Sequence, residues 1–491
     1  MRIQNADMLT CHGNQKGRRD IVEILSAGLD LVDPYVGTKK LVSRRGSILT
    51  FSGEEYELKG DPRSGPAVYD LKNFDRVIVV GAAKGVQRCA LALEEILGDY
   101  LTGGHVIGKH GDELLCKKIG VTLAGHPVPD AYSVEGSKNI YAWSKNVTER
   151  DLVITIMGSG VSSLMTWPVD GVTLAELQRL TQIMQIEKGA LTSELNYIRN
   201  HLDRLKGGKI SRLFSRATLV HLCTNDIGGS SNVKPGVRRT YTQVMQRNFF
   251  LATLADGGTF QDAIDTIDKY DAWDSLPASI TSYLRSAPPE DETVKQAEYE
   301  AMNARVFGLT PKMTTVYPAV KRKAEELGYK ALMLSECITA EARETGKVLA
   351  SIALNIESMA EPVAAPCALI SSGELIVTVG KETGIGGRNQ EFCVAAANAI
   401  SGSDRIVIGA VDTDGTDGPG GFKAPGAPPC LSGAIVDGYT AAEAAEKKVD
   451  LHGALKTHAT SQPLWELGCG IAATQSISAL DLRVIVIQAP K

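Results

Sequence analysis

The stretch TGIGGRNQE, residues 383–391, places three glycines ahead of Arg388, Asn389 and Glu391. An arginine at the start of a helix can stabilise the negative charge of a transferring phosphoryl group. Glycines before it let the backbone approach the same anion closely. Glu391 would face the same site or favour the first turn of the helix. The stretch therefore predicts an anion-binding turn with Arg388 as its cation, and Asn389 and Glu391 as further binding residues.

A second stretch, DTDGTDG at residues 412–418, spaces three aspartates with glycines. Carboxylates this close together attract a hard cation, which in phosphate chemistry is usually Mg²⁺. The predicted metal ligands are Asp414 and Asp417. The spacing does not fit the EF-hand loop. A structural alternative stays open, in which the aspartates cap Asp–Gly turns with their own side chains.

Three further glycine-rich turns follow predicted strands: VVGAAKG, IMGSGVSSL and CTNDIGG. In an open parallel sheet, ligands bind at the carboxyl ends of the strands. Backbone N–H groups beside a helix N-terminus favour phosphate or carboxylate there. Lys84 lies inside the first turn, where a compact ammonium suits phosphate. The predicted binding residues of the other two turns are Gly158, Ser159, Gly160, Ser162 and Asp226.

The first turn matches neither the dinucleotide fingerprint G-x-G-x-x-G nor the P-loop pattern G-x-x-x-x-G-K-[ST]. A nucleotide site at this turn must therefore be of another design. Ordinary βα turns are the alternative for each of the three, and their coincidence favours a ligand.

The segment NYIRNHLDRLKGGKI contains Asn196 and Arg199, which are three residues apart and share one face of a helix. Lys206 and a glycine pair come at its end. These three polar residues are predicted to bind substrate or phosphate. The alternative is a charged helix face closed by a glycine C-cap.

Compact β-branched runs followed by glycine turns and amphipathic helices predict strand–turn–helix units of a parallel sheet. Such runs begin at residues 75, 118, 151 and 216. Further on, residues 365–382 predict a β-hairpin with its turn near Ser372. The change of pattern predicts two domains, 1–358 and 359–491, both of the α/β class.

The composition is that of a globular protein with a sizeable core: 491 residues, 43% hydrophobic and 22% charged. A net charge of −5 argues against a general nucleic-acid binder. No run of 18 apolar residues and no apolar leader is present, so neither a membrane partner nor a signal peptide is expected. The nine cysteines include no C-x-x-C pair, which favours reduced thiols in a cytoplasmic protein. The sequence is compatible with a homo-oligomer.

Taken together, the motifs GHPVPD, NYIRNHLDRLKGGKI, GGRNQE and DTDGTDGP, in this order, resemble the type II glycerate kinases. Matching stretches run nearly from end to end. The resemblance implies a larger Rossmann-like domain with a parallel sheet, a smaller α/β domain of the MOFRL type, and an active site in the cleft between them.

The same resemblance implies ATP-dependent phosphorylation of the 2-hydroxyl of glycerate, giving 2-phosphoglycerate, with Mg²⁺. The partners are then ATP and a small hydroxy acid. The family's catalytic lysine and arginine match Lys84 and Arg388. Three alternatives stay open: a kinase for another small sugar acid such as erythronate or threonate, a hydroxypyruvate reductase, and a non-catalytic homologue that binds sugar acids.

Several loops depart from the family pattern. The glycine–serine turn reads MGSGVSSLM, NDIGGSSNVKPGVRRTY keeps Asp226 and nearby glycines, and AATQSISALD keeps Asp481. Residues 420–431 form an insertion after the aspartate loop. These departures make a larger or differently shaped sugar acid an alternative substrate.

Overall fold

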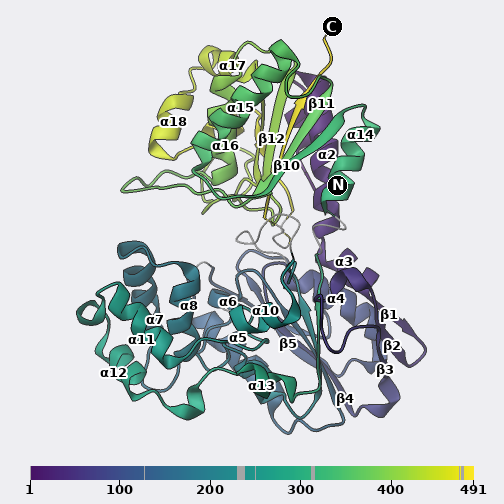
Figure 1. Ribbon diagram of the computed structural model, residues 1–491, viewed down its shortest axis with the longest axis vertical. Coiled ribbons are helices and arrows are strands. Elements are labelled where there is room, and N and C mark those ends of the chain that lie inside the picture. The colour runs from purple at the N-terminus through teal and green to yellow at the C-terminus, as the bar shows by residue number, and fades with distance from the viewer. Residues whose placement is uncertain are drawn as a thin grey trace. The chain divides into compact units, whose positions relative to one another are not determined.

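The computed structural model describes residues 2–126, 128–228, 238–248, 250–310, 316–474, 476 and 480–490 (Figure 1). The chain divides into two compact units. The described residues of 34–309 form the first, here called the Rossmann-like unit. The described residues of 2–33 and 310–490 form the second, here called the C-terminal unit. No described helix is both long and apolar enough to cross a membrane.

The Rossmann-like unit is built on a six-stranded parallel sheet in the order β6-β5-β4-β7-β8-β9. Its central strands are apolar runs buried on both faces, as expected for a parallel sheet covered by helices. The bounds are β4 (Arg76–Ala82), β5 (Gly103–Lys109), β6 (Gly120–Ala124), β7 (Asp151–Met157), β8 (Thr218–Cys223) and β9 (Ala304–Gly308). The predicted parallel α/β sheet is confirmed.

Helices cover both faces of this sheet (Figure 1). On one face lie α3 (Pro34–Leu41), α4 (Val86–Leu97) and a small antiparallel sheet of β1 (Val42–Arg45), β2 (Ile48–Phe51) and β3 (Ala67–Asp70). On the other lie α5 (Ala131–Ser144), α6 (Val161–Leu164), α9 (Lys209–Leu213), α10 (Tyr241–Arg247) and α13 (Gln296–Glu300). A separate cluster joins α7 (Leu174–Thr181), α8 (Thr192–His201), α11 (Phe260–Lys269) and α12 (Ala278–Ser286).

The strand order reverses between β4 and β7. Strands β5 and β6 follow β4 on one side of it, and β7, β8 and β9 lie in sequence order on its other side. Such a reversal opens a crevice at the carboxyl ends of the two strands, where doubly wound folds bind ligands. The register aligns Ala82 with Met157 and Met157 with Cys223. The three glycine-rich turns predicted from the sequence therefore leave the sheet side by side.

The C-terminal unit has a second six-stranded sheet in the order β10-β11-β15-β12-β13-β14. Strands β10 and β11 pair in parallel, and the other strand pairs described in this sheet are antiparallel. The bounds are β10 (Lys330–Ile338), β11 (Cys367–Gly373), β12 (Ile406–Asp412), β13 (Gly433–Asp437), β14 (Gly470–Ile471) and β15 (Asp481–Ile487).

The predicted hairpin at 365–382 is wrong. One strand, β11, ends at Gly373, and its antiparallel partner is β15, more than a hundred residues later in the sequence. A local turn does not close the pair, because the partner strand comes from the C-terminal end of the chain.

Helices also cover both faces of the second sheet (Figure 1). One face carries α15 (Ala342–Met359), α16 (Arg388–Ala399), α17 (Thr440–Glu446), α18 (Leu451–Thr457) and α19 (Ser461–Glu466). The other carries α2 (Gln15–Leu29) and α14 (Val316–Glu326), with the short α1 (Ala6–Thr10) beside α2.

This packing moves the domain boundary from the position predicted at 358/359. The apolar faces of α2, α14 and α15 are buried against the second sheet, and β10 is one of its strands. The N-terminal segment therefore belongs with the C-terminal unit, which the local pattern of the sequence does not reveal.

A buried ion pair fastens α2 to this sheet. Nε of Arg18 donates to Oδ2 of Asp437 at 2.6 Å, and both side chains are fully buried. Arg18 also donates to the hydroxyl of Thr440. Since neither charge reaches water, each depends on the other.

We expect Asp437→Ala to lower the free energy of unfolding by about 3–5 kcal/mol, because the substitution leaves Arg18 buried without its counter-charge. Urea unfolding followed by circular dichroism measures the loss. Asp75→Ala is the control, since it breaks an exposed aspartate–arginine pair and should leave stability nearly unchanged. Equal stability of the Asp437→Ala variant and the unsubstituted protein would contradict the role of the pair.

Candidate active site

Lys84 lies in the turn between β4 and α4, at the point where the strand order reverses. Its backbone N–H donates to the carbonyl of Ser159 at 2.8 Å, which ties the turn after β4 to the turn after β7. A Cβ added to Gly160 would lie 3.3 Å from Cγ of Lys84. The lysine side chain therefore runs directly past the glycine–serine turn.

The turn after β7 packs equally closely against the turn after β8. A Cβ on Gly158 would lie 1.7 Å from Oγ1 of Thr224, so only glycine fits at this position. The N–H of Ser159 donates to Oδ1 of Asn225 at 3.2 Å. The structure thus brings the predicted residues Lys84, Gly158, Ser159 and Gly160 together.

Asp226, in the turn after β8, is held by an ion pair. Its Oδ1 accepts from Nη2 of Arg238 at 2.5 Å and from the N–H of Gly228 at 3.2 Å. The carboxylate is almost fully buried. A direct role of Asp226 toward substrate stays a prediction, and its observed contacts fix the turn.

The predicted residues of α8 and of the turn that follows it lie near α6. Ser162, Arg199 and Lys206 line one narrow cavity. Asn196 is buried on the same helix, and within the described part of the chain its Oδ1 has no hydrogen-bond partner. The alternative of a solvated charged helix face is therefore wrong for this end of α8.

In the C-terminal unit, Arg388 begins α16 and lies between two carboxylates. Its Nε donates to both oxygens of Asp481, at 2.9 and 3.0 Å, and its Nη2 donates to Oδ2 of Asp412 at 2.7 Å. Burial lowers the pKa of the Arg388 guanidinium, but the charges of Asp481 and Asp412 have the larger combined effect and raise it. Glu374 adds a longer contact of 3.5 Å.

These two carboxylates face each other across the sheet, because Asp412 and Asp481 are cross-strand partners of β12 and β15. Like charges directly opposite each other destabilise a sheet. Burial and the charge of Asp414 raise the pKa of Asp412 well above its ordinary value. Arg388 supplies a cation to both carboxylates, and Nη1 of Arg483 pairs with Oδ2 of Asp481 at 3.0 Å.

Asp417 caps the N-terminus of α16. Its Oδ2 accepts from the N–H of Gln390 at 2.9 Å, and its Oδ1 accepts from the N–H of Asn389 at 3.1 Å. An anion bound to the first N–H groups of a helix is stabilised by the helix dipole. Both oxygens of the buried Asp417 therefore accept hydrogen bonds from α16, a role that differs from the predicted metal ligation and also from the self-capped Asp–Gly turn of the alternative.

The other residues of the GGRNQE motif also have partners within the unit. The amide of Asn389 donates to Asp417 at 3.2 Å and to Asp481 at 2.9 Å. Glu391 pairs with Nδ1 of His458 at 2.7 Å, and burial raises the pKa of this carboxyl. Direct ligand contacts of Asn389 and Glu391 stay predictions.

The glycines of the two polar stretches pack against one another. A Cβ on Gly387 would lie 2.3 Å from the carbonyl oxygen of Asp417, and a Cβ on Gly418 would lie 1.8 Å from that of Gly386. Backbone meets backbone at both points. Glycine is required here because the GGRNQE and DTDGTDG loops form one contact.

Asp414 is the remaining predicted metal ligand. Its Oδ1 accepts from the N–H and the hydroxyl of Thr416, at 2.8 and 2.7 Å. Among the residues that the structure describes, no three acidic, histidine or cysteine side chains converge in a way that could hold a metal ion by themselves. Any Mg²⁺ here would need oxygens from a bound ligand, which is how phosphate-bound Mg²⁺ is commonly held.

Neither Asp412 nor Asp481 is among the site residues predicted from the sequence. Each lies at the end of an apolar strand, and this position is the one feature of the sequence that could have indicated a functional role. Nothing in the sequence says that β12 and β15 are neighbours, so the pairing with Arg388 could not be read from it.

Two family models match the chain: a domain of unknown function, DUF4147, over residues 20–234, and the MOFRL family over residues 367–477. A D-glycerate 2-kinase of Thermotoga maritima is 32% identical over 372 residues, covering 75% of this chain and 80% of that protein. The chain belongs to the glycerate 2-kinase family.

A crystal structure of glycerate kinase from Thermotoga maritima matches this member of the family with a TM-score of 0.71 and 27% identity, covering 96% of this chain and 99% of that one. A protein of Agrobacterium vitis named putative hydroxypyruvate reductase is 33% identical over 346 residues, covering 70% of this chain and 73% of that protein. The family resemblance and the α/β fold predicted from the sequence are confirmed.

The position of Arg388 between two carboxylates predicts that one further substitution lowers the stability of the unsubstituted protein but raises that of the Arg388→Met variant. Arg388→Met should cost about 3–5 kcal/mol, because the buried Asp412 then loses its cation, whereas Asp481 keeps its pair with Arg483 at 3.0 Å. In that background, adding Asp412→Asn should recover part of the loss, because it removes the carboxylate left without a cation, although Asp412→Asn alone destabilises the protein.

Urea unfolding of the single variants and the double variant measures the cycle. Arg322→Met, which removes an exposed arginine of α14, is the control and should have little effect. If the losses of the two single variants simply add in the double variant, Arg388 does not neutralise Asp412.

Proposed function

We propose that this chain is an ATP-dependent kinase that transfers a phosphoryl group to the 2-hydroxyl of glycerate, giving 2-phosphoglycerate. The observation that carries the proposal is the position of Lys84 at the strand-order reversal, beside the glycine–serine turn. The family's members named as glycerate kinases support the reaction and its acceptor.

Phosphoryl transfer asks a protein mainly to position the reactants and to offset charge on the phosphoryl oxygens. Lys84 supplies a point charge for that purpose. Its backbone is held by Ser159, and Gly160 leaves room for the side chain to pass. Backbone N–H groups of Gly158 and Gly160 are proposed to hold the anion beside it. For Arg388, the role in offsetting phosphoryl charge stays the prediction of the GGRNQE motif.

Mg²⁺ and ATP belong to the proposed reaction. Mg²⁺ commonly binds through one or two carboxylates together with the phosphates of its nucleotide, and it offsets charge between the phosphates. Asp414 fits the first requirement, because it lies among buried acidic residues whose mutual repulsion a cation would relieve. Asp417 is left out of the proposed ligands, since its oxygens cap α16.

Reduction of hydroxypyruvate is the second candidate, and the name of the Agrobacterium vitis relative favours it. The turn after β4 reads GAAKG and lacks the dinucleotide fingerprint that most nicotinamide enzymes place there. Oxidation of NADH or NADPH by the purified protein with hydroxypyruvate would support this candidate over the kinase. We expect none.

The proposed function is tested by ADP release from Mg-ATP with purified protein and a panel of acids: glycerate, erythronate, threonate, tartrate and hydroxypyruvate. We expect release with glycerate. Release only with a four-carbon acid would keep the kinase and change its substrate. Binding of acids without ADP release would support a non-catalytic homologue and contradict the proposal.

Lys84→Ala should lower turnover by about 10²-fold or more, because it removes a charge aimed at the developing phosphoryl charge. The same assay measures the effect, and circular dichroism checks that the fold is retained. Lys118→Ala is the control, since the exposed ammonium of this lysine of the same unit contacts the carbonyl of Gly98 and the carboxylate of Asp99. Near-normal turnover of Lys84→Ala would remove the proposed role.

A further inference from the structure

A narrow polar cavity lies between α6, α7, α8 and the turn after α8. Its polar lining consists of Ser162, Ser163, Thr166, Thr181, Arg199 and Lys206, and its volume is about 20 Å³. A cavity of this size holds about one small polar group. It is too small for a nucleotide base or a sugar ring.

The cavity carries more positive than negative charge. Lys206 pairs with Asp203 at 3.1 Å and donates to the hydroxyl of Thr166 at 3.0 Å. Arg199 donates to the hydroxyl of Thr181 at 2.9 Å, and no carboxylate in the described part of the chain lies within ion-pair distance of it. Among the described residues, Lys206 therefore has a carboxylate partner and Arg199 has none.

Burial makes this excess charge costly. It lowers the pKa of Arg199 to about 10, and no carboxylate raises it again. Burial also lowers the pKa of Lys206, and the neighbouring charge of Arg199 lowers it further, against the opposing effect of Asp203. A bound anion would offset the unbalanced charge, because charged groups are stable in a protein interior when they are paired.

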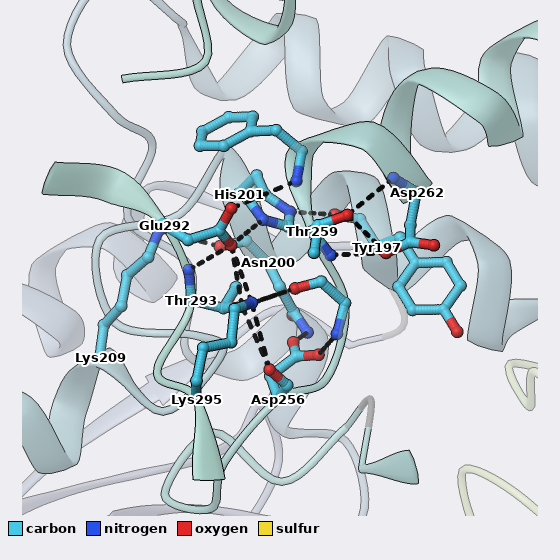
Figure 2. Close-up of polar contacts among 12 residues, drawn as sticks. Tyr197, Asn200, His201, Lys209, Asp256, Thr259, Asp262, Glu292, Thr293 and Lys295 are labelled. Atoms are coloured by element: carbon cyan, nitrogen blue, oxygen red, sulfur yellow. Dashed lines mark hydrogen bonds and ion pairs between the residues drawn. The ribbon is translucent and has the colours of Figure 1, made fainter. Parts of the chain in front are cut away.

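A network of hydrogen bonds and ion pairs holds the end of α8 that carries Arg199 (Figure 2). Arg199 itself is not one of the residues labelled in this network. The ammonium of Lys209 donates to the carbonyls of Asn200 and Asp203, at 3.0 and 2.9 Å, and so caps the last turn of α8. Oδ1 of Asp203 accepts from the N–H groups of Leu205 and Lys206. This fixes the backbone that carries Lys206.

His201 adds a second anchor to the same turn. Its Nδ1 lies 2.6 Å from the carbonyl of Tyr197, and its Nε2 lies 2.8 Å from Oε1 of Glu292. Lys295 bonds to the same oxygen of Glu292 at 2.9 Å. Burial raises the pKa of Glu292, but the hydrogen bonds to His201 and Lys295 have the larger effect and hold it well below its ordinary value. The contacts drawn in Figure 2 join these side chains to one another and to the backbone of α8, so the network supports α8 without supplying a partner for Arg199.

We propose that this cavity binds the carboxylate of the acid substrate, with Arg199 and Lys206 as its cationic ligands and the hydroxyl group of Ser162 beside them. The inference rests on the proposed function, because it names the part of the substrate that the kinase recognises. Ser162 comes two residues after Gly160, past which the side chain of Lys84 runs. A carboxylate in the cavity is thereby anchored close to the proposed phosphoryl-binding turn.

This assignment defines a substrate class. Small 2-hydroxy acids of different length share the carboxylate and the adjacent hydroxyl, and they differ only beyond these groups. Neutral analogues lack the group that the cavity binds. Glyceramide, in which an uncharged amide replaces the carboxylate, should therefore bind far more weakly than glycerate.

The test compares Arg199→Met with the unsubstituted protein. Calorimetric titration with glycerate in the absence of ATP should show binding weakened at least 10-fold in the variant, and ATP titrated alone should bind both proteins equally. In steady-state assays KM for glycerate should rise at least 10-fold while KM for ATP stays unchanged. Arg179→Met is the matched control, because this arginine of α7 forms an exposed pair with Glu187, and its binding of glycerate should be normal.

Arg199→Lys, which keeps the charge, should recover part of the affinity, and it remains informative if Arg199→Met does not fold. Weaker binding of ATP with normal binding of glycerate would overturn the proposal and assign the cavity to a nucleotide phosphate. Unchanged binding of both ligands would also overturn it. These failures are distinct from failure of the proposed function, which is absence of ADP release by the unsubstituted protein with every acid.

Discussion

The C-terminal unit depends on one electrostatic constraint: two aspartates, Asp412 and Asp481, face each other at the ends of adjacent strands. Burying two like charges side by side is costly unless cations pair with them. Arg388 donates hydrogen bonds to both, and so the first residue of α16 is fixed to the sheet. The loops on either side follow from this position, because α16 must then receive its N-terminal cap from Asp417.

Close backbone packing completes the arrangement. Gly387 and Gly418 allow the two polar loops to touch without side chains between them. The same principle builds the turns of the Rossmann-like unit, where Gly158 fits directly against Thr224. In both units a sheet register aligns the strand ends, and glycine lets the turns meet there. Charged side chains are then added at defined places: Arg388 in one unit, Lys84 in the other.

Much of this could be predicted from the sequence where the signal is local. β-branched runs followed by glycine turns identified the parallel sheet, and residue type and position singled out Lys84 and Arg388. Contacts between distant segments could not be predicted. The partner of β11 is β15, the second sheet takes up α2, and Asp481 reaches Arg388 across 93 positions of sequence. The altered loops at 229–237 and at 475 and 477–479 lie outside the described residues, so their effect on substrate choice stays a prediction.

The central claim is that the chain phosphorylates the 2-hydroxyl of glycerate, and the position of the phosphate in the product tests it most directly. Proton-coupled phosphorus NMR of the product formed from Mg-ATP and glycerate distinguishes the two hydroxyls. A phosphate on the 2-oxygen couples to the single hydrogen of C2, so the account predicts a doublet. A triplet, from coupling to the two hydrogens of C3, would contradict the account, as would a spectrum that contains only adenine nucleotides and inorganic phosphate.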